Sequence, residues 1–422
     1  MRIAVVGGGV SGLVAARLLH DRHEVTLYEA EPRLGGHAHT MEVEEEGRRI
    51  GVDTGFVVYN ERTYPLFTRL LDTLGVATRP TTMSFSVRCE RTGIEYNGGS
   101  LAGLLARPAN LADARFRRML GAVPRFWRDA RALLERPDEK LELGAFLEAG
   151  RYGEDFRDLH LRPMLGAIWS SPEDQVDAMP ALALARFLAN HGLLQLRDRP
   201  VWRVVEGGSS RYVERLAAPF RARVRLGCAV RGVRRDEDGV WVRDAGGSRA
   251  RFDQLVLATH APTALALLED ADEAERAVLG SFRTFRNEVA LHTDARLLPR
   301  RRRARAAWNA HRLADDDADG RSGIAVTYWM NLLQGLETRR DYCVTLNRTD
   351  AIRPEHLRAV MHYEHPVFDA RALAAQRLRD RICGRRRTHF AGAWWGYGFH
   401  EDGVRSATEV AARLGAMGAV RP

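Results

Sequence analysis

Glycines recur near the start of the chain at a spacing that can hold phosphates. The segment Gly7-Gly8-Gly9-Val10-Ser11-Gly12 follows a predicted strand, Arg2–Val6, and precedes a run with apolar residues at helical spacing. In such a pattern the first glycine permits a tight turn, the second admits a pyrophosphate, and the third lets helix and strand pack closely. The helix N-terminus attracts the phosphates. We therefore predict a dinucleotide site with contacts from Gly7, Gly9, Val10, Ser11 and Gly12.

An acidic residue stands where such a site requires one. The predicted second strand, Glu24–Tyr28, ends directly before Glu29. A carboxylate roughly 20 residues beyond the glycines binds the ribose hydroxyls of an adenosine. Strand, turn, helix and acidic residue together indicate a Rossmann-type domain.

The residues that follow indicate which dinucleotide is bound. Glu29-Ala30-Glu-Pro-Arg33-Leu-Gly35-Gly36-His37 resembles the E-A-x-x-R-x-G-G-R segment of the FAD-dependent amine oxidase and phytoene desaturase superfamily. In that superfamily the second glycine pair lies along the pyrophosphate and ribityl chain. The resemblance implies FAD as the cofactor and implies contacts from Ala30, Arg33, Gly35, Gly36 and His37. His37 stands where the superfamily has arginine.

Two further segments resemble the superfamily in the expected order. Short strands from Val224 to Val242 form a meander that returns to the sheet through 253–259, which implies an adenine contact from Val230. A strand at 388–392 and a helix beginning near Glu401 imply cofactor contacts from Gly392, Gly403 and Val404. The positive end of that helix would stabilise the negative charge of a reduced flavin. Ala393-Trp394-Trp395 replaces the usual acidic residue after the glycine.

Motifs along nearly the whole chain resemble one bacterial branch of this superfamily. Genes of this branch adjoin those of cyclopropane-fatty-acid-synthase-like methyltransferases, and a similar flavin domain begins the plant cyclopropane fatty acid synthases. The resemblance implies a fatty-acyl or phospholipid-acyl substrate. It also places Asp53, Gly55, Phe56, Tyr59 and Asn60 near the flavin. The motifs are 53–60, 64–65, 83–86, 327–331, 344–347 and 396–403.

Aromatic and ionisable residues follow Gly392. Trp394, Trp395, Tyr397 and Phe399 are candidates for the wall of the apolar tunnel that an acyl chain needs, and ordinary packing explains them equally well. His400 and Glu401 could move the proton that accompanies hydride transfer, although structural roles are favoured. No catalytic residue is assigned.

Three functions are open at this stage. The leading one is hydride transfer between flavin N5 and an acyl chain, which desaturates or saturates a carbon–carbon bond. The second is amine oxidation. Many amine oxidases place a lysine beside N5 through a water, and the single lysine here, Lys140, stands in a polar helix-start context. The third is a flavin-binding subunit of a lipid methyltransferase system.

The predicted fold class is α/β, with discontinuous domains. Residues 1–60, 201–285 and 385–422 form the FAD-binding domain, with a parallel sheet and an antiparallel meander. Residues 61–200 and 286–384 form an α+β substrate domain. The first of these two stretches is mostly helical. The second has predicted strands at 324–328 and 341–345 and a predicted helix around 354–361.

Composition sets further limits. The four cysteines are scattered, which favours reduced thiols in the cytoplasm and neither a disulfide framework nor a metal site. Met1 leads directly into the first strand, so no signal peptide is expected, and no apolar run is long enough for a membrane span.

The net charge is +9, but no nucleic-acid module accompanies it, so no nucleic-acid partner is expected. The basic amphipathic run 116–134 and Arg300–Arg303 suggest peripheral contact with an anionic membrane at its inner face, although a solvated arginine face is favoured.

Overall fold

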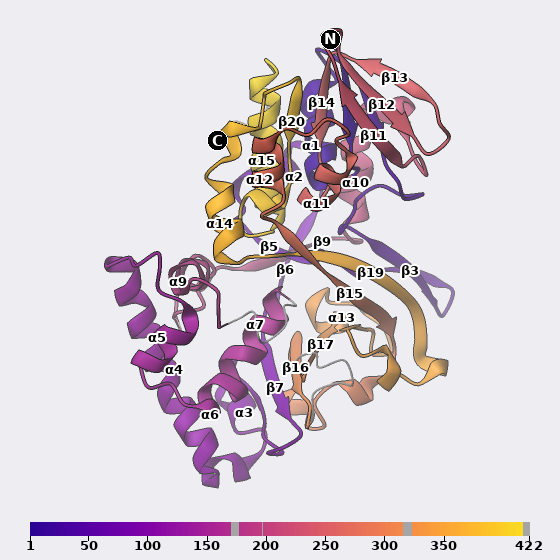
Figure 1. The fold of residues 1–422 in the computed structure, drawn as a ribbon. Helices are drawn as coiled ribbons and strands as arrows, with labels where there is room; N and C mark the ends of the chain where they lie inside the picture. Colours follow the sequence, from indigo (N-terminus) through magenta and orange to yellow (C-terminus); the bar gives the residue numbers. More distant parts are fainter. Residues whose placement is uncertain (170–176, 196, 315–322, 417–422) are drawn as a thin grey trace.

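The computed structural model describes residues 1–169, 177–195, 197–314 and 323–416 (Figure 1). A five-stranded parallel sheet organises the upper body in that view. Its central strand is the apolar, fully buried run that precedes the glycines, as expected for a parallel sheet covered on both faces. The strand order is β10 (Val224–Arg225), β2 (Glu24–Tyr28), β1 (Arg2–Val6), β14 (Gln254–Leu257) and β20 (Thr388–Phe390).

Helices and a meander complete this body. The antiparallel meander predicted between the parallel strands is present as β11 (Val230–Arg235), β12 (Val240–Asp244) and β13 (Arg249–Phe252). The first and last helices, α1 (Val10–Leu19) and α15 (His400–Arg413), pack against each other. The other helices here are α2 (Pro65–Thr73), α10 (Ser210–Ala217), α11 (Ala261–Leu267), α12 (Glu273–Leu279) and α14 (Ala370–Gln376).

A seven-stranded sheet organises the lower body. Its order is β19 (Leu357–Val367), β15 (Arg283–His292), β18 (Cys343–Leu346), β17 (Ile324–Trp329), β16 (Trp308–Arg312), β7 (Phe85–Cys89) and β8 (Glu95–Asn97). The helices are α3 (Leu101–Leu104), α4 (Ala114–Glu135), α5 (Leu143–Ala149), α6 (Glu154–Phe156), α7 (Arg162–Trp169), α9 (Ala181–Asn190) and α13 (Met330–Leu333). Long strands β15 and β19 run between the two bodies in Figure 1.

Two small sheets connect these parts. A hairpin pairs β3 (Thr40–Glu45) with β4 (Arg48–Asp53). Strand β9 (Trp202–Val205) lies between β5 (Val58–Asn60) and β6 (Thr78–Thr81). Residues far apart in the sequence are thereby brought to the junction between the two bodies.

The predicted fold class is confirmed, with one local error. The parallel strands all come from the ranges predicted for the FAD-binding domain, and the domain boundaries themselves stay a prediction. The helix expected around 354–361 is wrong. Only Pro354–His356 form a short 3-10 turn, and β19 begins at Leu357. Pairing with β15, from Arg283 opposite Val367 to His292 opposite Leu357, outweighs the local helical spacing.

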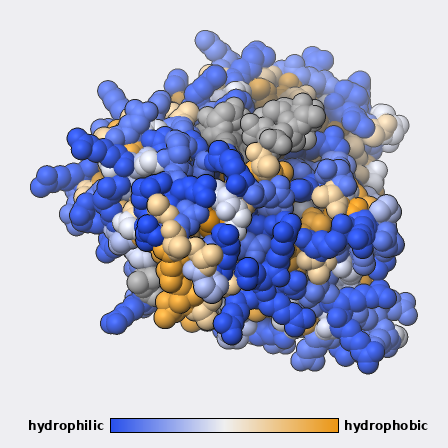
Figure 2. Space-filling view, turned by 90° about the horizontal axis from the view of Figure 1, so that it is seen from below, coloured by the Kyte–Doolittle hydropathy of each residue, from blue (hydrophilic) through white to orange (hydrophobic). Residues whose placement is uncertain are grey.

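The amphipathic run 116–134 lies within α4, and its apolar side chains pack inside the protein. Phe116, Met119, Phe126 and Leu133 are buried. The favoured structural interpretation of this helix therefore holds, and its apolar stripe is not available to a membrane. Seen from below, the surface is mainly hydrophilic with smaller apolar areas (Figure 2). None of the described helices is both long and apolar enough to cross a bilayer.

Candidate cofactor and substrate site

A cavity of about 410 Å³ lies where the carboxyl ends of the parallel strands face the seven-stranded sheet. Residues that follow β1, β2, β14 and β20 line one side, and side chains of β15 to β19 line the other. The carboxyl edge of an open parallel sheet is the usual place for a cofactor in such folds. The volume falls within the range of small-molecule and cofactor sites.

The first glycine segment has the geometry that a pyrophosphate requires. Gly7 has a φ of +107°, which favours glycine. A Cβ on Gly12 would lie 1.9 Å from the carbonyl oxygen of Gly7, so α1 packs against the turn as predicted. A Cβ on Gly9 would meet nothing within 4 Å, because this residue faces the cavity. Val10 and Ser11 also line the cavity.

The second glycine segment lies beside the first. The Gly35 N–H donates to the Gly8 carbonyl at 2.8 Å, and a Cβ on Gly36 would lie 3.1 Å from the Cα of Gly9. Arg33 does not line the cavity. Its guanidinium donates to the Gly36 carbonyl at 2.9 Å and so holds the loop. Ala30 does not line the cavity either.

Glu29 lines the cavity and is fixed by backbone donors. Its carboxylate accepts hydrogen bonds from the N–H groups of Gly8 at 2.6 Å and Glu31 at 2.8 Å. Val230, the predicted adenine contact, does not line the cavity. It lies nearby along the chain, since the Cys228 N–H donates to the Glu29 carbonyl at 2.8 Å.

His37 supplies a sharper indication of a ligand. Its Nε2 atom is shielded from solvent and has no hydrogen-bond partner among the described residues. Burial, together with nearby His365 and His260, holds the pKa of His37 well below its usual range. A buried polar atom without a partner is costly, so a bound group that satisfies it stabilises the site. The orphan nitrogen, the open face of Gly9 and the position of Glu29 all fit FAD.

The segment 53–60 is only partly at the cavity. Asp53, Gly55 and Phe56 line it, whereas Tyr59 and Asn60 do not. The Tyr59 hydroxyl donates to Thr78 at 3.2 Å, and Asn60 closes a turn with Thr63. The expectation that Tyr59 and Asn60 lie near the flavin is therefore not met by the cavity, because both side chains are used in local structure.

Asp53 is a buried carboxyl with a full set of partners. Its oxygens accept hydrogen bonds from the hydroxyls of Thr40 and Ser209, from the Ser209 N–H and from the Gln334 amide, at 2.6 to 3.1 Å. Burial outweighs these bonds and raises its pKa to about 6. Asp53 therefore ties the hairpin β3–β4 to α10 and α13 at the edge of the cavity.

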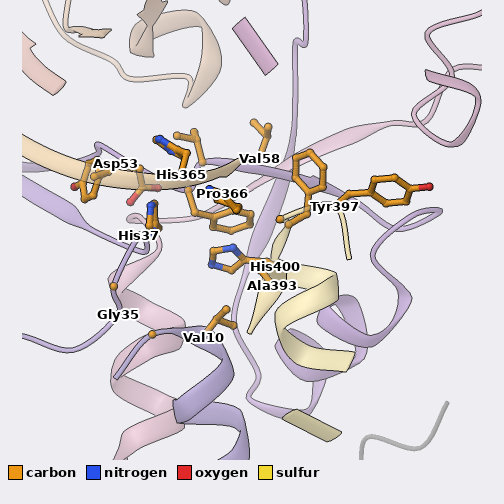
Figure 3. Close-up of a pocket in the computed structure, with 18 of the residues that line it drawn as sticks. Val10, Gly35, His37, Asp53, Val58, His365, Pro366, Ala393, Tyr397 and His400 are labelled. Carbon is orange, nitrogen blue, oxygen red and sulfur yellow. The ribbon is translucent and has the colours of Figure 1, made fainter. Parts of the chain in front are cut away.

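Of the candidate residues that follow Gly392, some line the cavity and others do not. Trp394, Tyr397 and Phe399 line the cavity with Gly392, whereas Trp395 does not. Trp395 donates from its indole nitrogen to the Phe390 carbonyl at 3.2 Å and packs on Phe282. In Figure 3 the phenol of Tyr397 points away from the labelled histidines.

Gly403 and Val404 lie in the packing between α15 and its neighbours, outside the cavity lining. A Cβ on Gly403 would lie 2.8 Å from Val10, so this glycine brings α15 close to the start of α1. Val404 is fully buried.

His400 and Glu401 have separate roles. His400 lines the cavity, stacks on Phe56 and shares a 2.7 Å hydrogen bond with the Tyr212 hydroxyl. Burial lowers its pKa to about 3. The Glu401 carboxylate accepts hydrogen bonds from the N–H groups of Leu66 and Phe67, at 3.0 to 3.2 Å. Glu401 therefore caps α2 and does not line the cavity. This agrees with the structural role that was favoured over proton transfer.

Apart from Tyr363 and His365 of β19, the part of the cavity that faces the seven-stranded sheet is mainly apolar. It is lined by Val58, Met83, Ile168, Phe187, Leu193, Val289, Trp308, Tyr328, Met330, Leu333, Val344 and Leu346. Neither lysine nor arginine is among the lining residues in the described part of the chain. Lys140 is exposed on a turn that precedes α5. The described residues contain no group of three or more histidines, cysteines or carboxylates able to hold a metal.

Two further histidines of the cavity wall were not found as site residues from the sequence. His365 and His260 line it beside His37, with ring centroids 5.2 and 5.9 Å from the His37 ring. Figure 3 shows His365 on β19 close to His37. The only sequence signal is the density of histidine and tyrosine in Met361-His-Tyr-Glu-His365, which does not specify a position in space.

Comparisons with known proteins identify the family of this chain. The model of the family of flavin-containing amine oxidoreductases matches residues 10–331, and the chain belongs to that family. The chain is 31% identical over 271 residues to AofH of Mycobacterium tuberculosis, which is named as a flavin-containing monoamine oxidase. That match covers 59% of this chain and 55% of AofH, so the chain spans about half the length of this curated relative.

Solved structures share the fold at low identity. Putrescine oxidase with putrescine bound aligns with a TM-score of 0.68 at 18% identity over 99% of both chains. A conjugated-linoleic-acid-producing fatty acid isomerase from P. acnes gives 0.68 at 16% identity over 98% of both chains. Cyclohexylamine oxidase from Brevibacterium oxydans gives 0.66 at 19% identity, again over 98% of both.

Family membership defines the class as FAD-dependent oxidoreductases, and FAD is the cofactor. When bound, FAD supplies the hydride acceptor or donor. The glycine segments and Glu29 would hold its phosphates and ribose, and His37 would hydrogen-bond to it through Nε2.

Proposed function

We propose that this protein transfers a hydride between FAD and a carbon–carbon bond of a fatty-acyl or phospholipid-acyl chain. The observation that supports this proposal is the apolar half of the cavity, which continues from the cofactor cradle into the seven-stranded sheet. An acyl chain needs apolar walls, and hydride chemistry at the flavin benefits from the exclusion of water. The residues' task is to bind and orient the chain.

The charges around the cavity favour an uncharged reacting centre. The only carboxylates among the described lining residues are Glu29 and Asp53. Backbone N–H groups hold Glu29, and four donors satisfy Asp53. A cationic amine buried among apolar side chains would lack a free counter-charge, which is costly.

Amine oxidation is the second candidate, and the 31% identity with AofH favours it. An amine that enters in its neutral form would tolerate the same apolar walls. A third arrangement, in which the chain serves a partner methyltransferase without turnover of its own, stays a prediction. Cytoplasmic location and peripheral contact with an anionic membrane also stay predictions, and α4 does not offer the apolar face for the latter.

Anaerobic titration of the FAD-loaded protein tests the proposal. Vesicles of phosphatidylglycerol with mono-unsaturated, methylene-bearing or methyl-branched acyl chains are added, and absorbance near the flavin maximum is followed. Bleaching of oxidised FAD, or reoxidation of chemically reduced FAD, by one of these lipids supports it, and mass spectrometry of the acyl chain locates the changed bond. A flavin that responds only to primary amines establishes amine oxidation instead. A flavin that responds to neither, with co-purification of a methyltransferase, establishes the subunit role.

A further inference from the structure

A chain of side-chain amides leads from a backbone N–H group to the cavity. Its members lie on three places of the seven-stranded sheet: Asn347 after β18, Asn287 on β15 and His365 on β19. Asn287 is completely buried, and His365 lines the cavity. Consecutive members are joined by hydrogen bonds of 2.6 Å and 2.8 Å.

The donor and acceptor of each hydrogen bond in this amide chain follow from its first hydrogen bond. The backbone N–H of Glu288 donates to the side chain of Asn347 at 2.9 Å, and a backbone N–H is always a donor. The atom of Asn347 that receives it is therefore the amide oxygen. The other atom, the NH₂ group, donates to the oxygen of Asn287, and the NH₂ of Asn287 then faces Nδ1 of His365. The orientation of both amides is thus fixed by the network.

The imidazole of His365 must adapt to that last donor. Because Nδ1 accepts a hydrogen bond, a neutral His365 carries its proton on Nε2. Nε2 has no hydrogen-bond partner among the described residues and belongs to a side chain on the cavity wall. Burial lowers the pKa of His365 to about 4, which keeps the ring neutral at pH 7.

We propose that His365 is a directed hydrogen-bond donor to the flavin, with its proton held at Nε2 by the Asn347–Asn287 amide chain. The ring lies 5.2 Å from that of His37 on the second glycine segment, at the boundary between the cofactor cradle and the apolar half. The flavin pyrimidine carries nitrogen and oxygen acceptors that can receive this donor. The inference depends on FAD as cofactor and not on the acyl substrate of the proposed function.

Such a donor would act on the flavin electrostatically. A reduced flavin gains negative charge, and a preorganised N–H aimed at it favours the reduced state. Asn287 and Asn347 touch neither cofactor nor substrate in this arrangement and are positioning residues. Their contribution is to keep Nε2 a donor and to prevent it from becoming an acceptor.

Nitrogen NMR and redox titration of the FAD-loaded protein test this inference. With ¹⁵N-labelled histidine at pH 7.5, His365, assigned by its loss in His365→Phe, should show a protonated Nε2 and an unprotonated Nδ1, both before and after FAD is bound. A proton at Nδ1, or exchange between both nitrogens, would overturn the inference.

Asn287→Asp gives the complementary result. A carboxylate at 287 accepts from Nδ1, so His365 should acquire a proton at Nδ1, and the flavin midpoint potential and absorption maximum should shift from the wild-type values. His365→Phe should lower the midpoint potential. Asn331→Asp is the matched control, because Asn331 lies outside the cavity lining, and its potential should equal that of the wild type. Unchanged potentials in both test variants, with FAD still bound, would show that His365 does not contact the flavin. None of these readouts requires a substrate, so a failure here is distinguishable from a failure of the proposed function.

Discussion

The rings of Phe56 and His400 stack with centroids 3.5 Å apart and planes inclined by 16°. Phe56 follows the hairpin β3–β4, and His400 begins the last helix of the chain, so the stack joins two segments of the cavity wall that are more than three hundred residues apart. The Tyr212 hydroxyl fixes the other edge of His400. These contacts hold the two segments together at one side of the cavity.

Gly9 and Gly12 should respond differently to the same added methyl group. Gly9→Ala places Cβ in open space toward the cavity, so the apoprotein should keep its thermal midpoint while its affinity for FAD falls at least about tenfold. Gly12→Ala forces Cβ against the Gly7 carbonyl, and overpacking of this kind costs about 1–3 kcal/mol. Calorimetry and flavin fluorescence measure the two effects. An equal fall of the thermal midpoint in both variants would contradict the inference that Gly9 faces the cavity and Gly12 packs against the turn.

Glu401 should matter for stability and not for proton transfer. Glu401→Leu removes the acceptor for the N–H groups of Leu66 and Phe67, and loss of such a cap costs about 0.5–2 kcal/mol. Glu401→Gln keeps one acceptor and should cost less. Turnover per bound flavin should be unchanged in both variants. If Glu401 carried the proton, turnover would fall in both, whatever their thermal midpoints.

Acid should destabilise the apoprotein through its buried histidines. His365 and His400 have folded pKa values of about 4 and about 3, below the ordinary value of 6.5. The stability that neutral rings provide is present above pH 6.5 and is lost as pH falls, by about 2 kcal/mol per ring at pH 5. Asp53, whose pKa is raised to about 6, has the opposite effect. Its protonation adds about 1 kcal/mol to the free energy of unfolding as pH falls from 7 to 5.

The net result for the wild type is a lower thermal midpoint at pH 5 than at pH 7, measured without FAD. His400→Phe removes one titrating ring, so the difference between the two midpoints should shrink. A midpoint that rises on acidification would show that these rings are already charged in the folded protein.

A bulky residue at position 58 should obstruct the apolar half of the cavity. Val58 on β5 lines it. Val58→Trp should leave FAD content and spectrum intact and, if the substrate is the proposed acyl chain, raise its KM about tenfold, equivalent to about 1.4 kcal/mol. Val360→Trp introduces the same side chain on β19 at a residue that is 41% exposed and outside the cavity lining, and it should have no effect. Identical kinetics for both variants would place the substrate elsewhere.

The parts of the fold that could be predicted are those whose signal is local. The strands β1 and β2 were predicted with their bounds, and the turn and a following helix were predicted between them, because buried strands, glycines and Glu29 follow one another directly. β19 was mistaken for a helix because its partner β15 lies about seventy residues earlier, beyond the reach of local spacing. Tyr59 and Asn60 were placed at the site by resemblance, and their side chains form local hydrogen bonds instead. Trp395 was a candidate because it follows Gly392, and of the two interpretations left open for it, ordinary packing is the one observed.

The place of His365 at the cavity could not be predicted for the same reason. His365 gains its position from β19, and its tautomer from an asparagine on β15 and another after β18. No window of the sequence contains all three. The apolar half of the cavity likewise draws single residues from many strands and helices, so its character is visible only after assembly.

The register of the pairing between β15 and β19 determines which side chain of β19 faces the cavity. His365 stands opposite Phe285, between Glu364 and Pro366. Because alternate residues of a strand face opposite sides, a single residue inserted or deleted within 357–364 would shift the register and exchange the imidazole for a carboxylate or a proline ring. The hydrogen-bond donor that we propose for the flavin would then be lost without any substitution at the cavity. A change in the length of this one strand would therefore alter the cavity as directly as a substitution of His365 itself.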